Sequence, residues 1–454
     1  MHPRLASPDE PARPLWCVST VSELPEVACS WAAANGFDPG PGKHLAVPDG
    51  QGGLAGFVVG LAVEGKPAEP FFAGRLPSIL PEGVWRLEGA VADPRTAALG
   101  WLLGCYSFGR YKTAKAPAAR LVVPEGVDAD DLTRIADAVT EGRDLVNTPS
   151  NDLGPAEIEE AIRALGARYG AQVSSVVGEA LLEQNFPMIH AVGRASPRAP
   201  RLIDLSWGDP AAPKVTLVGK GVCFDTGGLD IKPSAGMLLM KKDMGGAAAA
   251  MAAARMVMDA GLRVRLRLLV PAVENAIAGA AFRPGDILAS RKGLSVEIGN
   301  TDAEGRLILA DALTLAEEEQ PEILIDFATL TGAARVALGP ELPPLYSDDD
   351  ALAADLLAAG TAENDPLWRM PLWSPYDSML DSKVADLDNV GPGGMAGSVV
   401  AALFLRRFVA PGRAWAHLDI YAWNPSSKPG RPEGGEVQAA RAVYAMLSRR
   451  YRGR

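Results

Sequence analysis

The sequence predicts an α/β protein in which a small N-terminal domain precedes a larger domain with a mostly parallel central sheet flanked by helices. Three observations support this fold class. The chain has 454 residues, which is more than one ordinary core requires. Its second part alternates β-branched segments with helical ones. Clusters of charged residues and glycines follow two of the expected strands, as they do at the edge of an open α/β sheet.

The first 125 residues contain short apolar runs, such as 57–63 and 121–123, which Gly and Pro interrupt. This pattern is typical of a small α/β domain, although it does not define the strand order. A helix is expected over 130–146, where apolar residues recur at helical spacing before the stop signal at Pro149. We place the domain boundary in this helix, with an N-terminal domain over 1–140 and a larger domain over 141–454.

The larger domain is expected to alternate strands and helices along the chain. Strands are predicted at 215–218, 265–270, 294–298 and 322–327. Helices are predicted over the Ala- and Met-rich segment 244–259, which Gly261 closes, and over 307–318. This order predicts the mostly parallel sheet.

Charge and cysteine usage limit the partners and the compartment. The formal net charge of −11 argues against nucleic acid or an anionic membrane as the main partner. The four cysteines form no CxxC pair, so free thiols in a reducing cytoplasm are expected. The first 16 residues lack the apolar core of a secretory signal, and no apolar run approaches the ~20 residues that span a bilayer.

Two clusters carry the chemistry. The first contains Lys220, Asp225, Lys232 and Asp243, and the second contains Asp302, Glu304 and Arg306. One cluster follows the strand expected to end near 218, and the other follows the strand expected to end near 298. Because ligands bind beyond the carboxyl ends of parallel strands, we expect both clusters at one edge of one sheet.

The charges in these clusters predict a metal site. Four carboxylates held together repel one another, and two divalent cations would neutralise them. Oxygen-rich ligand sets favour Mg, Mn or Zn. Two metal ions ~3.5–4 Å apart can share a bridging water and lower its pKa. A nearby ammonium group could stabilise a developing oxyanion.

Other hydrolytic motifs are missing from the sequence. None of the four histidines lies in either cluster, and there is no HExxH motif. There is also no GxSxG elbow to support a Ser-His-Asp triad.

Three segments carry a family resemblance. They are VGKGVCFDTGGLDIKP at 218–233, MKKDMGGAAA at 240–249 and NTDAEGRLILADAL at 300–313. They resemble the hallmark segments of the leucyl aminopeptidase family of dinuclear metallopeptidases, and the resemblance extends over roughly 140–445. It implies a metal-dependent hydrolase, a protease that removes the first residue from peptides with a free N-terminus. It also implies a macro-domain-like N-terminal domain, a cytoplasmic location and a homohexamer.

The resemblance also implies the metal ligands. The tighter-binding ion, Mn or Zn, would be held by Lys220, Asp225, Asp243 and Glu304. A second, more exchangeable ion would be held by Asp225, Asp302 and Glu304, so that two carboxylates bridge the pair.

The remaining site residues follow from the same resemblance. Lys232 would polarise the scissile carbonyl, and Arg306 would position a bicarbonate that acts as general base toward the bridging water. Substrate would be bound by Met240, Asn300, Thr329 and Gly332.

Two regions depart from the family, and three other functions stay open. The motifs do not match residues 1–125, and the segment 421–432 is changed, which leaves the preference for leucine undecided. One alternative is a non-catalytic DNA-binding or regulatory relative, and a second is an inactive structural relative. The third is a different two-metal hydrolase, such as a phosphatase.

Overall fold

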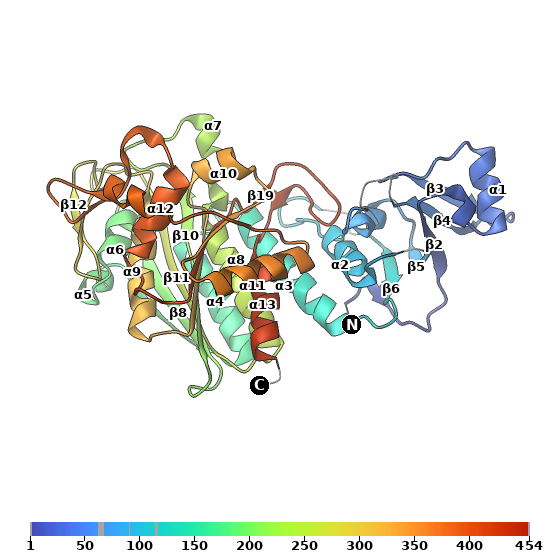
Figure 1. Ribbon diagram of the computed structural model, residues 1–454, viewed down its shortest axis with the longest axis horizontal. Coiled ribbons are helices and arrows are strands. Elements are labelled where there is room, and N and C mark those ends of the chain that lie inside the picture. The colour runs from blue at the N-terminus through green and yellow to red at the C-terminus, as the bar shows by residue number, and fades with distance from the viewer. Residues whose placement is uncertain (1, 62–67, 90, 114–116, 453–454) are drawn as a thin grey trace. The chain divides into compact units, whose positions relative to one another are not determined.

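The computed structural model describes residues 2–61, 68–89, 91–113 and 117–452 (Figure 1). The chain divides into two compact units. The first unit comprises Met1–Thr140 and Pro425–Glu433, and the second comprises Glu141–Asn424 and Gly434–Arg454. The helix α3 (Ala129–Asn147) contains the point where the chain passes from the first unit to the second.

The first unit is built on a six-stranded sheet of order β1-β6-β5-β2-β4-β3, in which only the β3–β4 pair is antiparallel among the described residues. Its strands are β1 (Leu5–Ala6), β2 (Arg13–Val18), β3 (His44–Pro48), β4 (Leu54–Gly60), β5 (Gly83–Gly89) and β6 (Ala119–Val122). Its helical segments are η1 (Val21–Glu23), α1 (Glu26–Ala34), η2 (Phe72–Ser78) and α2 (Pro94–Gly104). The run expected over 57–63 is β4, and its positions 62 and 63 lie outside the described residues.

The second unit is built on a nine-stranded sheet of order β16-β15-β18-β14-β9-β11-β8-β7, with β10 paired to β11. Its strands are β7 (Gln172–Val177), β8 (Arg201–Trp207), β9 (Lys214–Gly219), β10 (Gly221–Asp225), β11 (Arg265–Asn275), β14 (Ile323–Ala328), β15 (Pro344–Tyr346), β16 (Trp368–Arg369) and β18 (Trp415–Asp419). The central strands β18, β14, β9 and β11 are parallel. The predicted mostly parallel sheet is therefore confirmed.

Helices flank this sheet and connect its strands. They are α4 (Pro155–Tyr169), α5 (Ala180–Glu183), α6 (Pro187–Gly193), α7 (Ser234–Met237), η3 (Met240–Met244), α8 (Gly245–Asp259), α9 (Glu304–Glu318), α10 (Gly332–Leu338), α11 (Asp350–Ala362), η4 (Ser374–Leu380), η5 (Pro392–Gly394), α12 (Gly397–Arg406) and α13 (Ala440–Tyr451). In the part of the chain that the structure describes, every helix is too short or too polar to span a bilayer.

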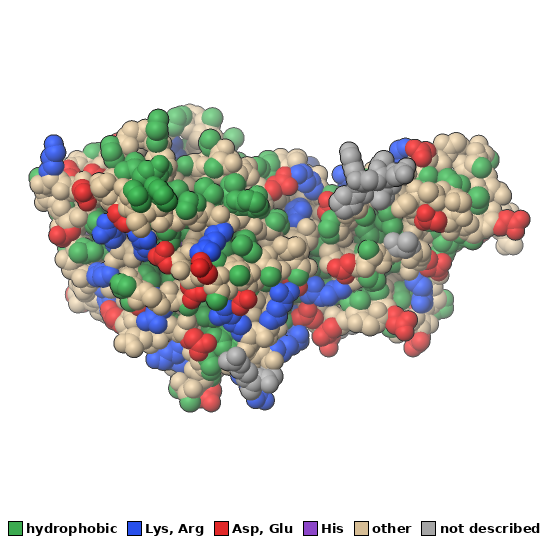
Figure 2. Space-filling view, viewed as in Figure 1, with side chains coloured by type: hydrophobic (Ala, Val, Ile, Leu, Met, Phe, Trp, Pro, Cys, Tyr) green, Lys and Arg blue, Asp and Glu red, His purple; other side chains and the backbone are tan. Residues whose placement is uncertain are grey.

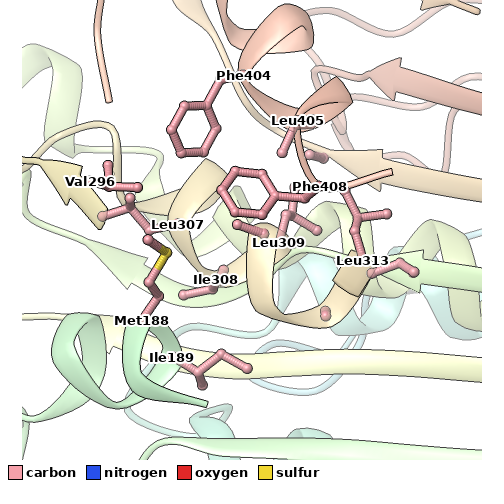
Figure 3. Packing of buried hydrophobic residues seen from close by; sticks show 14 of the residues in the cluster. Met188, Ile189, Val296, Leu307, Ile308, Leu309, Leu313, Phe404, Leu405 and Phe408 are labelled. Carbon is pink, nitrogen blue, oxygen red and sulfur yellow. The ribbon is translucent and has the colours of Figure 1, made fainter. Parts of the chain in front are cut away.

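The core on one face of the second unit's sheet forms around α9. Successive residues of α9, including Leu307, Ile308 and Leu309, are fully buried and pack under Phe404 and Phe408 (Figure 3). Burying a side chain of this kind contributes roughly 1.5–3 kcal/mol. This packing holds the first turn of α9, which carries the second charged cluster, against the sheet.

The expected strand at 294–298 does not belong to the main sheet, so one part of the prediction was wrong. It forms β13 (Ser295–Glu297), which pairs with β12 (Ile287–Ala289) and β17 (Leu387–Asp388) in a separate three-stranded sheet. The remaining short strands, β19 (Trp423–Asn424) and β20 (Gly434–Gly435), pair with each other. Asp302 therefore reaches the site from a neighbouring small sheet, because β13 finds its partners there and not at the edge of the main sheet.

Candidate metal centre

Lys220 occupies the single position between β9 and β10 and is almost fully buried. Its Nζ lies 2.8 Å from Oδ2 of Asp243 and 3.0 Å from Oε1 of Glu304, and it donates a 2.9 Å hydrogen bond to the main-chain oxygen of Thr329. A Cβ at position 305 would lie 2.5 Å from Cε of Lys220 and would displace the lysine, so glycine is the residue that suits this position. The first turn of α9 can therefore approach the lysine closely.

Asp225 ends β10, at the carboxyl edge of the main sheet. Its Oδ1 accepts hydrogen bonds from the Gly227 main-chain N–H at 2.8 Å and from Asn275 Nδ2 at 2.9 Å. Its Oδ2 lies 2.8 Å from Nζ of Lys232. Asn275 ends the neighbouring strand β11, so two adjacent strand ends orient this carboxylate.

The turn before α9 supplies the second group of carboxylates. Asn300 Oδ1 accepts a 2.7 Å hydrogen bond from the main-chain N–H of Asp302, which fixes the turn. The half-buried Asp302 carboxylate pairs with Lys232. Glu304 is the first residue of α9, where the helix dipole favours a negative charge.

The predicted ligands fit a divalent cation. Carboxylate oxygens of Asp225, Asp302 and Glu304 lie within 4.8 Å of one another. Oε2 of Glu304 is buried and has no hydrogen-bond partner among the described residues. Asp243 joins this group through Lys220, which contacts both Asp243 and Glu304. An oxygen-rich donor set with an unsatisfied buried carboxylate oxygen is the environment that a hard cation fills.

The pKa values of the carboxyl groups indicate that the two lysines do not neutralise all of the carboxylates in this cluster. Burial, together with the charge of Asp225, raises the pKa of Glu304 to about 8 and that of Asp302 to about 6. Burial also acts to lower the pKa of Lys220 and of Lys232, but the surrounding carboxylates outweigh it and raise both pKa values. With protein groups alone, the carboxylates cannot all stay ionised at neutral pH, and added cations would remove this constraint.

Arg306 lies in the first turn of α9 and is mostly buried. Its Nη1 donates a 2.6 Å hydrogen bond to the main-chain oxygen of Asn389, and its Nε is buried without a partner among the described residues. Burial lowers the pKa of Arg306 to about 10, so the group is still a cation at neutral pH. An unsatisfied cationic nitrogen of this kind suits a small anion.

The predicted substrate residues adjoin these ligands. Thr329 donates a 2.8 Å hydrogen bond from Oγ1 to the main-chain oxygen of Asp243. Met240 begins η3, three positions before Asp243, and Gly332 begins α10 just after Thr329. The structure therefore places Met240, Thr329 and Gly332 on segments next to the carboxylates.

Two residues that support the site were given no role in the sequence analysis. Asn275 orients Asp225, and Asn389 binds the turn before Asp302. Both are fully buried asparagines. A buried amide needs several hydrogen-bond partners. The sequence does not show which ones they are, because they can lie far along the chain: Asn389 is 83 residues from Arg306.

Comparison with known proteins identifies the family to which the chain is similar. Residues 141–444 match the catalytic domain of the cytosol aminopeptidase family, and residues 22–124 match the N-terminal domain of M17 aminopeptidases. A relative from Roseiflexus castenholzii, named "Probable cytosol aminopeptidase", is 43% identical over 366 residues, which cover 77% of this chain and 75% of the relative. A relative of the same name from Caulobacter vibrioides is 39% identical over 411 residues, covering 86% and 82%.

Solved structures agree with these matches. The cytosol aminopeptidase from Coxiella burnetii matches with a TM-score of 0.92 at 45% identity, over 98% of both chains. The bottromycin maturation enzyme BotP in complex with Mn matches with a TM-score of 0.87 at 35% identity, over 96% of this chain and 99% of that one.

Fold, site and matches together define a hydrolase of the aminopeptidase class. The chain belongs to the cytosol aminopeptidase family. The N-terminal match also covers residues 22–124 of the region that the sequence motifs left unassigned.

Proposed function

We propose that this protein is a dinuclear metallo-aminopeptidase that removes the N-terminal residue from peptides. The observation that carries the proposal is the convergence of Asp225, Asp302 and Glu304 beside two lysines, with one buried glutamate oxygen left without a partner. A relative whose structure contains Mn supports the choice of a divalent cation.

The ligands of the two ions, Mn or Zn, would be Asp225, Asp243, Asp302 and Glu304, together with Lys220, which would bind as a neutral amine after it loses its proton. Bound there, the ions would neutralise the carboxylates, lower the pKa of a water molecule and bind the free α-amine of the substrate. The requirement for a free amine explains why the enzyme would act only on the first residue of a peptide.

Lys232 would stabilise the transition state. It now pairs with Asp225 and Asp302, which are both proposed metal ligands. Once those carboxylates are occupied by cations, the ammonium is free to donate to the carbonyl oxygen of the scissile bond. Negative charge develops on that oxygen as the bond is attacked, so the contact strengthens in the transition state.

Arg306 would hold a small anion such as bicarbonate close to the reacting water. Its buried Nε has no partner among the described residues, and its Nη1 is held by Asn389. The guanidinium is therefore fixed in orientation and still has a donor to offer. An anion bound there could accept a proton.

The substrate side chain would meet Met240, Thr329 and Gly332, with Asn300 nearby. We assign residues 1–140 to the N-terminal domain and 141–454 to the catalytic domain, which the matches over 22–124 and 141–444 support. The names of the relatives support a cytoplasmic location.

We also infer a homohexamer from the family resemblance, and exposed apolar surface supports an interface between copies of the chain. Figure 2 shows hydrophobic side chains gathered over the part of the second unit where α10 and α12 lie. Val336 of α10 is 90% exposed and Met395, just before α12, is 80% exposed. Contiguous apolar surface of this kind marks protein interfaces. Analytical ultracentrifugation tests this inference, and a monomer at micromolar concentration would contradict it.

The decisive experiment is hydrolysis of amino-acyl p-nitroanilides after chelation and after adding back Mn or Zn. Metal-dependent release from free-amine substrates, but not from their N-acetylated forms, is expected. Release that survives chelation, or equal release from acetylated substrates, would overturn the proposal.

A further inference from the structure

We propose that the pocket for the first side chain of the substrate accepts an acidic residue, aspartate or glutamate, through the cations Arg335 and Lys242. This inference rests on the proposed aminopeptidase function and names the substrate class of the same site.

Arg335 stands directly beside one of the proposed pocket residues. It lies in α10, and a Cβ built on Gly332 would be 3.5 Å from its Nη2. Its guanidinium carbon is 4.7 Å from the ring centroid of Tyr421. Its one hydrogen bond among the described residues is long, 3.4 Å from Nη1 to the main-chain oxygen of Thr331. Most of its five N–H donors are therefore left for a ligand.

Lys242 contacts the same tyrosine ring. Its Nζ is 4.7 Å from the Tyr421 centroid, and the side chain is only 2% exposed. Over the described part of the chain, Nζ makes neither a hydrogen bond nor an ion pair within 4 Å. Its Nζ therefore has hydrogen-bond donors left for an anion that enters the pocket beside Arg335. Lys242 lies two positions after Met240, another proposed pocket residue.

The neighbouring acids are engaged elsewhere. The charged groups that face Lys242 are Asp243, Asp419, Arg335 and Lys220. The Asp243 carboxylate pairs with Lys220 at 2.8 Å. Asp419 accepts hydrogen bonds from the main-chain N–H groups of residues 330 and 331 and from the hydroxyls of residues 331 and 398. Neither carboxylate is thus dedicated to Arg335 or Lys242, so both side chains can bind an incoming anion.

A carboxylate is the group that this arrangement recognises. Guanidinium binds carboxylate through two parallel hydrogen bonds, and a second cation nearby strengthens the attraction in a poorly solvated pocket. Two sources could provide the carboxylate, namely the first side chain or the C-terminus of a dipeptide. The position of Arg335 beside Gly332 favours the side chain. Tyr421, whose ring both side chains contact, begins the segment 421–432 that departs from the family pattern.

The test compares kcat/KM for glutamyl and leucyl p-nitroanilide in the Mn-loaded, full-length enzyme. We expect glutamyl anilide to be hydrolysed at least as well as leucyl anilide. Arg335→Met should lower the glutamyl-to-leucyl ratio by about 10- to 100-fold, the size expected when a charged hydrogen-bond donor is removed. Arg335→Lys keeps the charge and should restore part of the ratio, and Lys242→Met should lower the ratio in the same direction.

Arg449→Met is the matched control, because it removes the same charge from an exposed position in the last turn of α13. It should leave the ratio unchanged. A wild-type enzyme that prefers leucyl anilide, or a ratio that Arg335→Met does not change, would overturn the inference while leaving the aminopeptidase intact. If Arg335→Met instead weakens hydrolysis of Leu-Gly relative to Leu-Gly-amide, the carboxylate is the C-terminus and the inference is also overturned. Absence of hydrolysis of both anilides would overturn the proposed function itself.

Discussion

Asn389 accepts a 2.6 Å hydrogen bond from Nη1 of Arg306 through its main-chain oxygen, while its side chain binds the turn that leads to Asp302. Oδ1 accepts from the main-chain N–H of Gly299 at 2.8 Å, and Nδ2 donates to the main-chain oxygen of Asn300 at 2.8 Å. One fully buried residue therefore orients both the arginine and the carboxylate turn.

Asn389→Ala is expected to lower both the melting temperature and kcat/KM. The change removes the hydrogen-bond partners of main-chain groups at the exposed Gly299 and the half-buried Asn300, at about 0.5–1.5 kcal/mol for each bond. Thermal unfolding and anilide hydrolysis measure the two effects. Asn151→Ala, at an exposed asparagine, is the control. An Asn389→Ala enzyme with unchanged stability and activity would show that the turn holds its shape without this side chain.

Asp302→Ala and Glu304→Ala are each expected to abolish turnover. Each removes a proposed metal ligand from the group whose oxygens lie within 4.8 Å of one another. Activity with Mn and the metal content of the purified protein are the measurements. Glu183→Ala, which removes an exposed carboxylate in α5, should behave as wild type. A wild-type kcat in either site variant would refute the metal assignment.

Lys232→Ala is expected to reduce kcat by about 10²–10³-fold and to change KM much less. The ammonium would act on charge that develops only in the transition state, so its loss affects the rate more than the binding of substrate. Steady-state kinetics separates the two parameters. Lys383→Ala removes an exposed lysine and serves as the control. A change confined to KM would assign Lys232 to ground-state binding.

Local sequence patterns predicted the helices and strands that depend on the spacing of neighbouring residues. Apolar residues at helical spacing predicted the helix over 130–146, which is observed as α3. A β-branched run predicted β9, alternating charged and apolar residues predicted β11, and a strand-like run predicted β14. The strand at 294–298 was also predicted, but its sheet was not. Strand pairing depends on residues far along the chain, and β17, the parallel partner of β13, lies near residue 388.

In the site, too, local features could be predicted from the sequence and long-range contacts could not. Charged residues grouped by short motifs were found, because carboxylates and lysines near strand ends are visible in sequence. The contacts that hold these groups were not visible. Asn389 acts across the small sheet, and Tyr421 meets Arg335 and Lys242 only through the fold. These contacts could not be predicted from residue spacing, because they join residues on different helices, strands and loops.

A buried ion pair in the second unit gives the last prediction, which concerns pH. Nη2 of Arg143 lies 2.8 Å from Oε2 of Glu436, and both side chains are almost completely buried. Burial acts to raise the pKa of Glu436, but Arg143 outweighs it and lowers the pKa to about 2, from 4.5 as the ordinary value. Because the folded pKa is depressed, the stabilising contribution is present above about pH 4.5 and is lost as the pH falls toward 2.

Glu436→Gln should therefore destabilise the protein at neutral pH by about 3–5 kcal/mol, since the buried arginine loses its charged partner. The difference from wild type should shrink below about pH 4.5, because the wild type then loses stability that the variant never had. Urea unfolding at about pH 7, 5 and 4 measures both free energies of unfolding. Glu183→Gln, at an exposed carboxylate, gives the baseline. A difference that stays constant across this range would mean that Glu436 does not titrate with a depressed pKa.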